Sequence, residues 1–142
     1  MAIPEPKPGL VIRYSYLWND EAERGREEGR KDRPCVVILA VQTVNGQTVV
    51  TVAPTTHTPP SAPGEAVEIP PAVKLRLGLD DQRSWVVTTE VNRFAWPGID
   101  LRPVSREKRD VFAFGYAPGA LVEAIRRQIA VRRRVRIVSR AE

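Results

Sequence analysis

The chain is poor in the residues that build disulfides and metal centres. Cys35 is its one cysteine and His57 its one histidine. A single cysteine permits no intrachain disulfide and no cysteine zinc site. Because Cys35 lies inside an apolar run, we interpret it as a small buried hydrophobe rather than a reactive thiol. No cluster of histidine, cysteine and carboxylate residues has metal-ligand spacing, so the sequence disfavours a metallonuclease and we expect no cofactor.

Long apolar segments are also missing. No apolar run approaches the ~18–20 residues that a membrane span needs. The start, residues 1–8, has no charged region followed by an apolar one, as a signal peptide would. We therefore expect a cytoplasmic protein without a membrane partner. The 142 residues are 42% apolar and predict one domain over 1–142, and a net charge of +5 moderately favours an anionic partner.

A predicted hairpin over residues 33–58 organises the chain. Residues 35–41 form a nearly unbroken apolar, β-branched run that is typical of a strand buried on both faces. Asn45-Gly46 predicts a type I′ turn, after which residues 47–53 pair back on the first strand. The start of one antiparallel strand lies beside the end of the other, so we expect Arg33 next to Thr55 and Thr56. A guanidinium beside hydroxyls at a sheet rim indicates an oxyanion or phosphate site.

Two unusual segments precede this hairpin. Residues 1–9 are rich in proline and predict an extended arm, which leads into a half-buried strand over 10–18. Residues 19–33 form a charged loop in which eleven of fifteen residues are ionisable. Loops of this length in compact domains are often functional or disordered, so the segment is either a solvated connector or a mobile charged lid. The spacing of Glu23 with Glu27, and of Arg26 with Arg30, also permits a frayed helix.

Short strands and two helices are expected after the hairpin. Pro71 opens a short helix over 72–77, and residues 80–82 form a turn. A strand follows over 84–91, and the C-terminal helix begins at 118–119. Its apolar stripe consists of Leu121, Val122, Ile125 and Ile129. Residues 135–142 are interpreted as a tail that could include a last strand. The pattern predicts a mainly β protein of five to seven strands, a small antiparallel barrel or sandwich with the C-terminal helix packed on it.

The order of these motifs resembles the MazF/PemK/Kid toxin family over roughly residues 8 to 130. The likeness is carried by Pro-Gly-Leu-Val-Ile-Arg-Tyr at 8–14, by the long loop leading to Arg33-Pro34 and an apolar strand, and by Val-Ala-Pro-Thr-Thr at 52–56. The resemblance implies an SH3-like barrel that forms homodimers and has a cognate antitoxin. It also implies a metal-independent endoribonuclease that cuts single-stranded RNA and leaves a 2′,3′-cyclic phosphate.

Carried onto this sequence, the resemblance makes Arg33 the catalytic arginine and Thr56 or Thr55 the catalytic threonine. Glu28 matches a glutamate five residues before the arginine. The chemistry needs a base, an acid and a cation for the pentacoordinate phosphate, since the substrate supplies its own 2′-hydroxyl as nucleophile. His57 could serve as base or acid, because histidine titrates near neutral pH. An exposed loop residue is the interpretation that we favour for it.

Arginines are concentrated near the C-terminus and predict an RNA-binding surface. The candidates are Arg126, Arg127, Arg132, Arg133, Arg134 and, from the strand before Pro97, Arg93. Some of them also complement the helix dipole, which is a sufficient structural reason for their presence. Two hypotheses therefore stand: an endoribonuclease toxin, or a catalytically inactive barrel that binds RNA or protein. For the homodimer, the hairpin and the Ile125/Ile129 stripe would offer apolar area.

Overall fold

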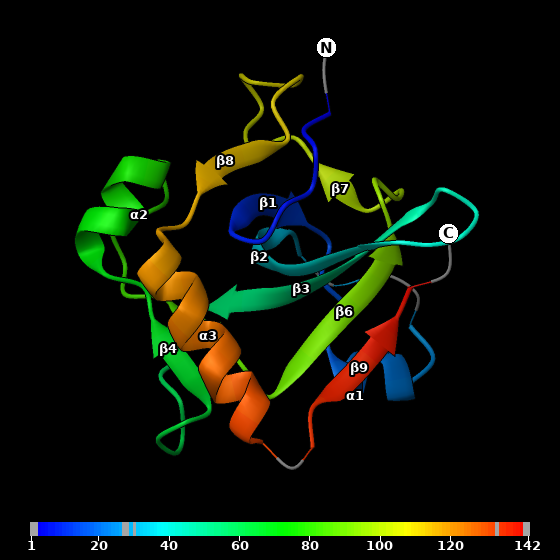
Figure 1. Ribbon diagram of the computed structural model, residues 1–142. Coiled ribbons are helices and arrows are strands. Elements are labelled where there is room, and N and C mark those ends of the chain that lie inside the picture. The colour runs from blue at the N-terminus through cyan, green and yellow to red at the C-terminus, as the bar shows by residue number, and fades with distance from the viewer. Residues whose placement is uncertain (1–2, 27–28, 30, 133, 141–142) are drawn as a thin grey trace.

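The computed structural model describes residues 3–26, 29, 31–132 and 134–140, which form nine strands and three helices (Figure 1). In chain order these are β1 (Leu10–Tyr14), α1 (Asn19–Glu23), β2 (Arg33–Gln42), β3 (Thr48–Thr56), β4 (Ala66–Glu68), α2 (Pro71–Leu77), β5 (Trp85–Val87), β6 (Glu90–Ala95), β7 (Leu101–Arg102), β8 (Ala113–Tyr116), α3 (Gly119–Val131) and β9 (Arg136–Ser139). The predicted class, mainly β with a C-terminal helix, is confirmed. The strand count exceeds the five to seven expected because several strands are only two to four residues long.

All nine strands belong to one sheet. Its main path is β4-β5-β3-β2-β1-β7, while β6 pairs with β3 and β9, and β8 pairs with β1. Neighbours run antiparallel except β6 and β9, which are parallel. β3 pairs with β6 over 49–52 and with β5 over 55–56. Successive parts of this one strand therefore belong to two branches of the sheet. This branching brings the end of β3 next to both the start of β2 and the region after α2.

The central hairpin is buried on both faces only in its first half, at 35–38 and 50–55. The prediction of burial along the whole apolar run 35–41 is wrong toward the tip, where Leu39 and Val41 are 45% and 50% exposed. The cross-strand pair Val37 and Val52 lies in a cluster with Tyr14 and Phe94, whose rings stack at 4.4 Å. The neighbouring positions, including Val36, face a second cluster beneath α3. Each face of the hairpin therefore has its own core, which fixes the register of the two strands.

The turn of this hairpin differs from the prediction. Gly46 N–H donates to the carbonyl of Thr43 over 3.0 Å, so the central turn residues are Val44 and Asn45. Gly46 has φ 79°, whereas none of the described non-glycine residues has a positive φ. A type I′ turn needs positive φ at both central residues, so the type I′ prediction at Asn45-Gly46 is wrong. Glycine instead takes the left-handed position that ends a longer hairpin loop.

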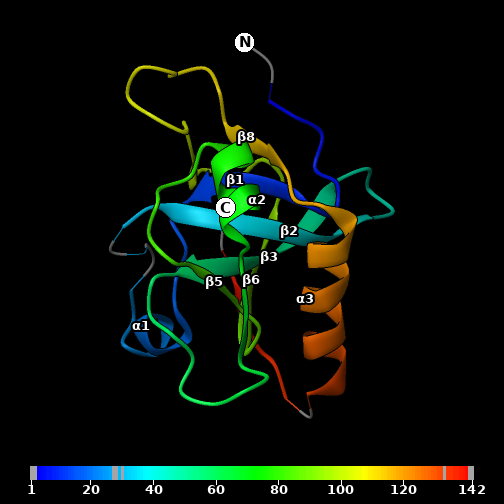
Figure 2. The same cartoon turned by 90° about the vertical axis from the view of Figure 1, so that its left-hand side faces the viewer.

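Helix α3 covers one face of the sheet. Leu121, Val122 and Ile125 are buried in the cluster that includes Val36, and Ile129 packs at its margin. Figure 2 shows α3 and α1 on opposite sides, with β2 and β3 running between them. Ile125 is fully buried within the chain, so the expectation that it offers area to a partner is wrong, whereas Ile129 is only partly buried.

The C-terminal segment is not a tail. β9 runs parallel to β6 with Val138 buried, and Arg140 follows it into the interior (Figure 1). Arg140 Nη2 lies 2.5 Å from Asp100 Oδ2, and both side chains are at most 5% exposed. Of the two alternatives for this segment, a tail or a last strand, the strand is confirmed over Arg136–Ser139. The partner that anchors Arg140, Asp100, lies forty positions away in the chain.

Within the described ranges, no helix combines the length and apolar character needed to cross a membrane.

Candidate active site

Arg33 stands at the first position of β2, opposite Tyr14 of β1. Its Nη1 donates a hydrogen bond to the carbonyl oxygen of Thr55 over 3.0 Å. Its guanidinium carbon lies 4.8 Å from the centre of the Trp18 ring, a cation–π contact. The predicted proximity of Arg33 to the end of β3 is therefore confirmed.

The charge of Arg33 has no carboxylate partner in the described part of the chain. Burial lowers the pKa of Arg33, although a guanidinium stays charged near neutrality. Its buried Nε has no hydrogen-bond partner among those residues. An unsatisfied buried donor is costly. Because Nε is buried, the terminal N–H groups of Arg33 are the donors that an anion in the pocket could reach.

The carboxylates that could have neutralised Arg33 are engaged elsewhere. Asp32 lies 3.8 Å from Arg13 and 3.7 Å from Arg102. Glu90 accepts hydrogen bonds from the Tyr16 hydroxyl at 3.1 Å and from the backbone N–H of Asn19 at 2.8 Å. Burial raises the pKa of Glu90 despite these bonds. Glu21, whose charge acts on Arg33 and raises its pKa against the effect of burial, accepts a 3.0 Å bond from the Trp18 N–H and lies 3.9 Å from Arg26. Glu28 lies outside the described residues.

A buried polar cluster fixes the segment that brings Trp18 to Arg33. The side chain of Asn92 accepts from the Leu17 N–H and donates to the Leu17 carbonyl, at 2.9 and 2.7 Å. Arg140 Nη1 donates to Asn92 Oδ1 and to the Ser15 carbonyl. Every one of these bonds joins residues far apart in sequence. The cluster thus links Arg140, after the last strand, to the position of Trp18. Trp18 in turn contacts Arg33.

The two candidate threonines have different environments. Thr55 is 5% exposed, and its hydroxyl donates to the Pro34 carbonyl over 2.8 Å. The half-buried Thr56 hydroxyl accepts a 3.1 Å bond from Thr58 N–H, so its own hydrogen is not used by the protein. Thr56 is accordingly the threonine with a donor available for a ligand, while Thr55 supports the strand end and Arg33.

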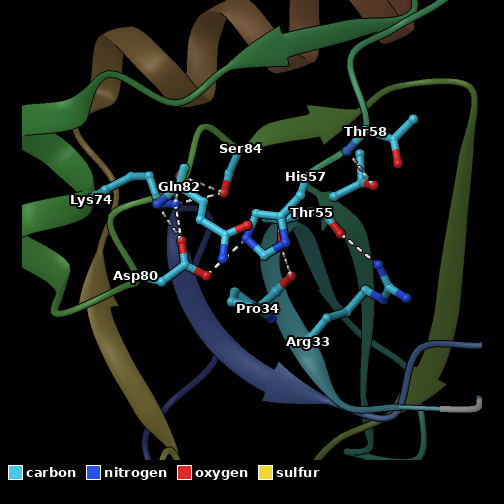
Figure 3. A network of polar contacts seen from close by, with 10 residues as sticks. Arg33, Pro34, Thr55, His57, Thr58, Lys74, Asp80, Gln82 and Ser84 are labelled. Atoms are coloured by element: carbon cyan, nitrogen blue, oxygen red, sulfur yellow. Dashed lines mark hydrogen bonds and ion pairs between the residues drawn. The ribbon is translucent and has the colours of Figure 1, made fainter.

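A pocket of about 250 Å³ joins these groups. Arg33, Thr55, Thr56 and His57 contribute to its wall, together with Lys74 from α2 and Asp80 from the following turn. Figure 3 shows these side chains converging from β2, the end of β3 and the α2 region. Its polar wall and the unpaired guanidinium suit a small anionic group such as a phosphate.

His57 is exposed, as expected of a loop residue, but it has a partner that the sequence did not predict. Its Nε2 lies 2.8 Å from Asp80 Oδ2. Lys74 donates to Asp80 Oδ1 at 2.5 Å, to Ser84 Oγ at 2.6 Å and to the carbonyl of Gln82. One sequence signal pointed to Lys74: it lies three residues before Leu77, on the buried side of a short helix. None pointed to Asp80.

The predicted RNA-binding arginines do not reach the pocket. Arg126, Arg127 and Arg134 are exposed, and Arg127 lies 3.6 Å from Glu123 on the same helix. Arg132 donates to the Gly64 carbonyl, and Arg93 is exposed on β6 opposite Thr51. Arg133 falls outside the described residues. None of the described arginines of this set lines the pocket.

Comparison with known proteins gives one family match. Residues 16–113, more than half of the chain, match the family of PemK-like, MazF-like toxins of type II toxin-antitoxin systems. The matched segment contains every pocket residue named above and ends before α3. No curated protein matches the chain.

Proposed function

The chain belongs to the PemK-like, MazF-like toxins of type II toxin-antitoxin systems, and we propose that it is an endoribonuclease that cuts single-stranded RNA without a metal ion. The observation that carries the proposal is Arg33, a half-buried cation with no carboxylate partner in the described chain, in the wall of a phosphate-sized pocket. The proposed products are a 2′,3′-cyclic phosphate and a 5′-hydroxyl, and the RNA substrate makes the cytoplasm its place of action.

The proposed chemistry assigns a distinct task to each group. The 2′-hydroxyl of the substrate attacks the neighbouring phosphorus, and negative charge grows on the phosphate oxygens in the transition state. Arg33 stabilises that charge with its planar fork, held in advance by Thr55 and Trp18. Thr56 donates its hydroxyl hydrogen to a phosphate oxygen. Because both groups are preorganised by the sheet, little reorganisation is needed during the reaction.

RNA affinity is proposed to come mainly from cations outside the pocket. Arg126, Arg127 and Arg134 project from the C-terminal part of the chain, and their contacts with phosphates would be independent of sequence. Arg140 is excluded from this set, because its side chain is 2% exposed and bound to Asp100.

A homodimer is proposed to form through the outer face of the hairpin. Leu39 and Val41 are 45% and 50% exposed, and the register places Val41 beside Val49 on the same face. In Figure 1 the hairpin tip lies well away from α3. An apolar face of this kind is typical of subunit interfaces. Light scattering that shows only a 15.9 kDa species at micromolar concentration would contradict the dimer. The second proposed partner is a cognate antitoxin, which the family implies.

The alternative function is a barrel that binds RNA or protein without cutting it. One experiment separates the two: purified protein is incubated with a long single-stranded RNA in excess EDTA. The endoribonuclease proposal predicts discrete cleavage products that Arg33→Ala eliminates. Intact RNA with a retarded gel band would favour the binding protein instead.

A further inference from the structure

The least expected feature of the pocket is the chain of contacts from His57 through Asp80 to Lys74. These residues come from the end of β3, the turn after α2, and α2 itself. His57 Nε2 and Asp80 Oδ2 are 2.8 Å apart, and Asp80 Oδ1 accepts from both Lys74 and the backbone N–H of Gln82. Figure 3 shows the imidazole between the Asp80 carboxylate and the part of the pocket that contains Thr55 and Arg33.

Lys74 uses all of its hydrogen-bond donors within the protein. Its ammonium group is only 6% exposed and donates to Asp80, Ser84 and the Gln82 carbonyl, which uses all three of its hydrogens. A buried ammonium with three acceptors cannot turn toward a substrate without leaving two of them unsatisfied. Its effect is therefore on Asp80, whose orientation it fixes.

This support determines how Asp80 acts on His57. Partial burial opposes ionisation, but the hydrogen bonds from Lys74 and His57 prevail and lower the pKa of Asp80. An ionised carboxylate accepts hydrogen bonds and cannot donate them. Nε2 of His57 must therefore carry the shared hydrogen, and Nδ1 of the neutral ring is left as an acceptor. In the described part of the chain, no residue hydrogen-bonds to Nδ1.

We infer that His57 is the general base of the cleavage step, and that Asp80 and Lys74 are positioning residues that hold its ring in the required tautomer. The inference rests on the proposed ribonuclease function. Nδ1 takes the proton of the 2′-hydroxyl while the 2′-oxygen bonds to phosphorus. The bond from phosphorus to the 5′-oxygen breaks, the leaving 5′-oxygen takes a proton from solvent, and His57 returns its proton to water.

The other charged groups lining the pocket do not compete for this task. They are Lys31, Asp32, Arg33, Lys74 and Asp80. Arg33 stays protonated near neutral pH. Lys31 and Lys74 carry ammonium groups, which donate hydrogen bonds but cannot accept them. Asp32 pairs with Arg13 and Arg102, and Asp80 is bonded on both oxygens. In the described wall of the pocket, His57 presents the unoccupied basic nitrogen.

The test measures single-turnover cleavage of an RNA oligonucleotide in EDTA from pH 5 to pH 9. The variants are His57→Ala and Asp80→Asn, and Asp81→Asn is the matched control because Asp81 is the adjacent exposed aspartate outside the pocket wall. For the wild type we expect the rate to rise with pH and then level off, because the base must be unprotonated to act. His57→Ala should lose that rise and fall by roughly 10²-fold or more at pH 8, the scale of general base catalysis.

Two further readouts separate positioning from folding. Added imidazole should restore part of the activity of His57→Ala, because the small base can occupy the vacated space, but should not restore Asp80→Asn. Asp80→Asn should lower the plateau rate by at least about tenfold, since an amide can favour the wrong tautomer. Asp81→Asn should match the wild type, and melting temperatures should show that all variants are folded.

The possible results separate a failure of the general-base role of His57 from a failure of the proposed ribonuclease function. A wild-type protein that leaves the RNA intact removes both. Wild-type cleavage together with an unchanged pH profile in His57→Ala removes only the general base and leaves Arg33 and Thr56 as the active groups. Equal rates for Asp80→Asn and Asp81→Asn remove the positioning role of Asp80.

Discussion

Replacing Arg33 by lysine tests whether its planar fork, and not only its charge, drives the reaction. Lysine keeps the positive charge and can still donate one bond to the Thr55 carbonyl, which Arg33 contacts at 3.0 Å. The substitution weakens that anchor and the 4.8 Å cation–π contact with Trp18. We expect a stability loss of about 1 kcal/mol, which lowers the melting temperature of a chain this size by about 3 °C.

The effect on cleavage should be larger than the effect on stability. A lysine ammonium is a point charge, whereas the planar guanidinium of Arg33 presents terminal N–H groups in a fixed geometry, so one preorganised donor is lost in the transition state. The expected fall in rate is roughly 10²-fold, equivalent to about 2.7 kcal/mol. RNA affinity should change little, because the exposed arginines that we propose to supply it lie outside the pocket.

The assay is single-turnover cleavage on prefolded protein, with RNA affinity and melting temperature measured on the same samples. Arg76→Lys is the matched control, since Arg76 also donates to a backbone carbonyl, that of Tyr116, but is exposed and outside the pocket wall. Cleavage by Arg33→Lys at the wild-type rate would refute the reasoning. So would a parallel fall in rate and affinity, which would make Arg33 a simple binding residue.

Two further predictions concern the C-terminal segment. Arg140→Met should destabilise the fold by about 3–5 kcal/mol, because it leaves a buried Asp100 without its closest partner; thermal unfolding checks this, and a loss below 1 kcal/mol would contradict it. Replacing three exposed helix-end arginines by glutamine should reduce the slope of log affinity against log salt by about 2, and an unchanged slope would mean that they do not contact RNA. Those three are Arg126, Arg127 and Arg134.

The part of the site that sequence could predict depends on local pattern. The apolar run after Pro34 and the glycine-containing turn identify a hairpin, and antiparallel pairing then requires Arg33 to meet the end of the returning strand. That contact is present as the bond to Thr55. The helix over 71–77 was equally predictable, because proline at its start and Gly78 at φ 73° after its end mark both boundaries.

The rest depends on contacts between segments with no shared local signal. Asp80 looks like an ordinary turn residue, and its pairing with His57 exists only because the chain passes through α2 and returns to the end of β3. The choice between a tail and a last strand after residue 135 stayed open for the same reason. The alternation around Val138 suggested a strand, but the parallel partner β6 and the buried Asp100 cannot be read from residues near it. The choice between Thr55 and Thr56 likewise needed the positions of their hydroxyl partners.

The central claim is that the substrate's own 2′-hydroxyl is the nucleophile and that the protein stabilises the phosphate through Arg33. The most direct measurement uses an RNA oligonucleotide cut at one mapped site, and a second copy with a single 2′-deoxynucleotide immediately 5′ of that bond. Our account predicts that the all-RNA oligonucleotide gives a 2′,3′-cyclic phosphate by mass spectrometry, and that the modified copy is not cut at that bond although it binds equally well. Cleavage of the modified copy at that bond, or a linear 3′- or 5′-phosphate formed directly, would contradict it.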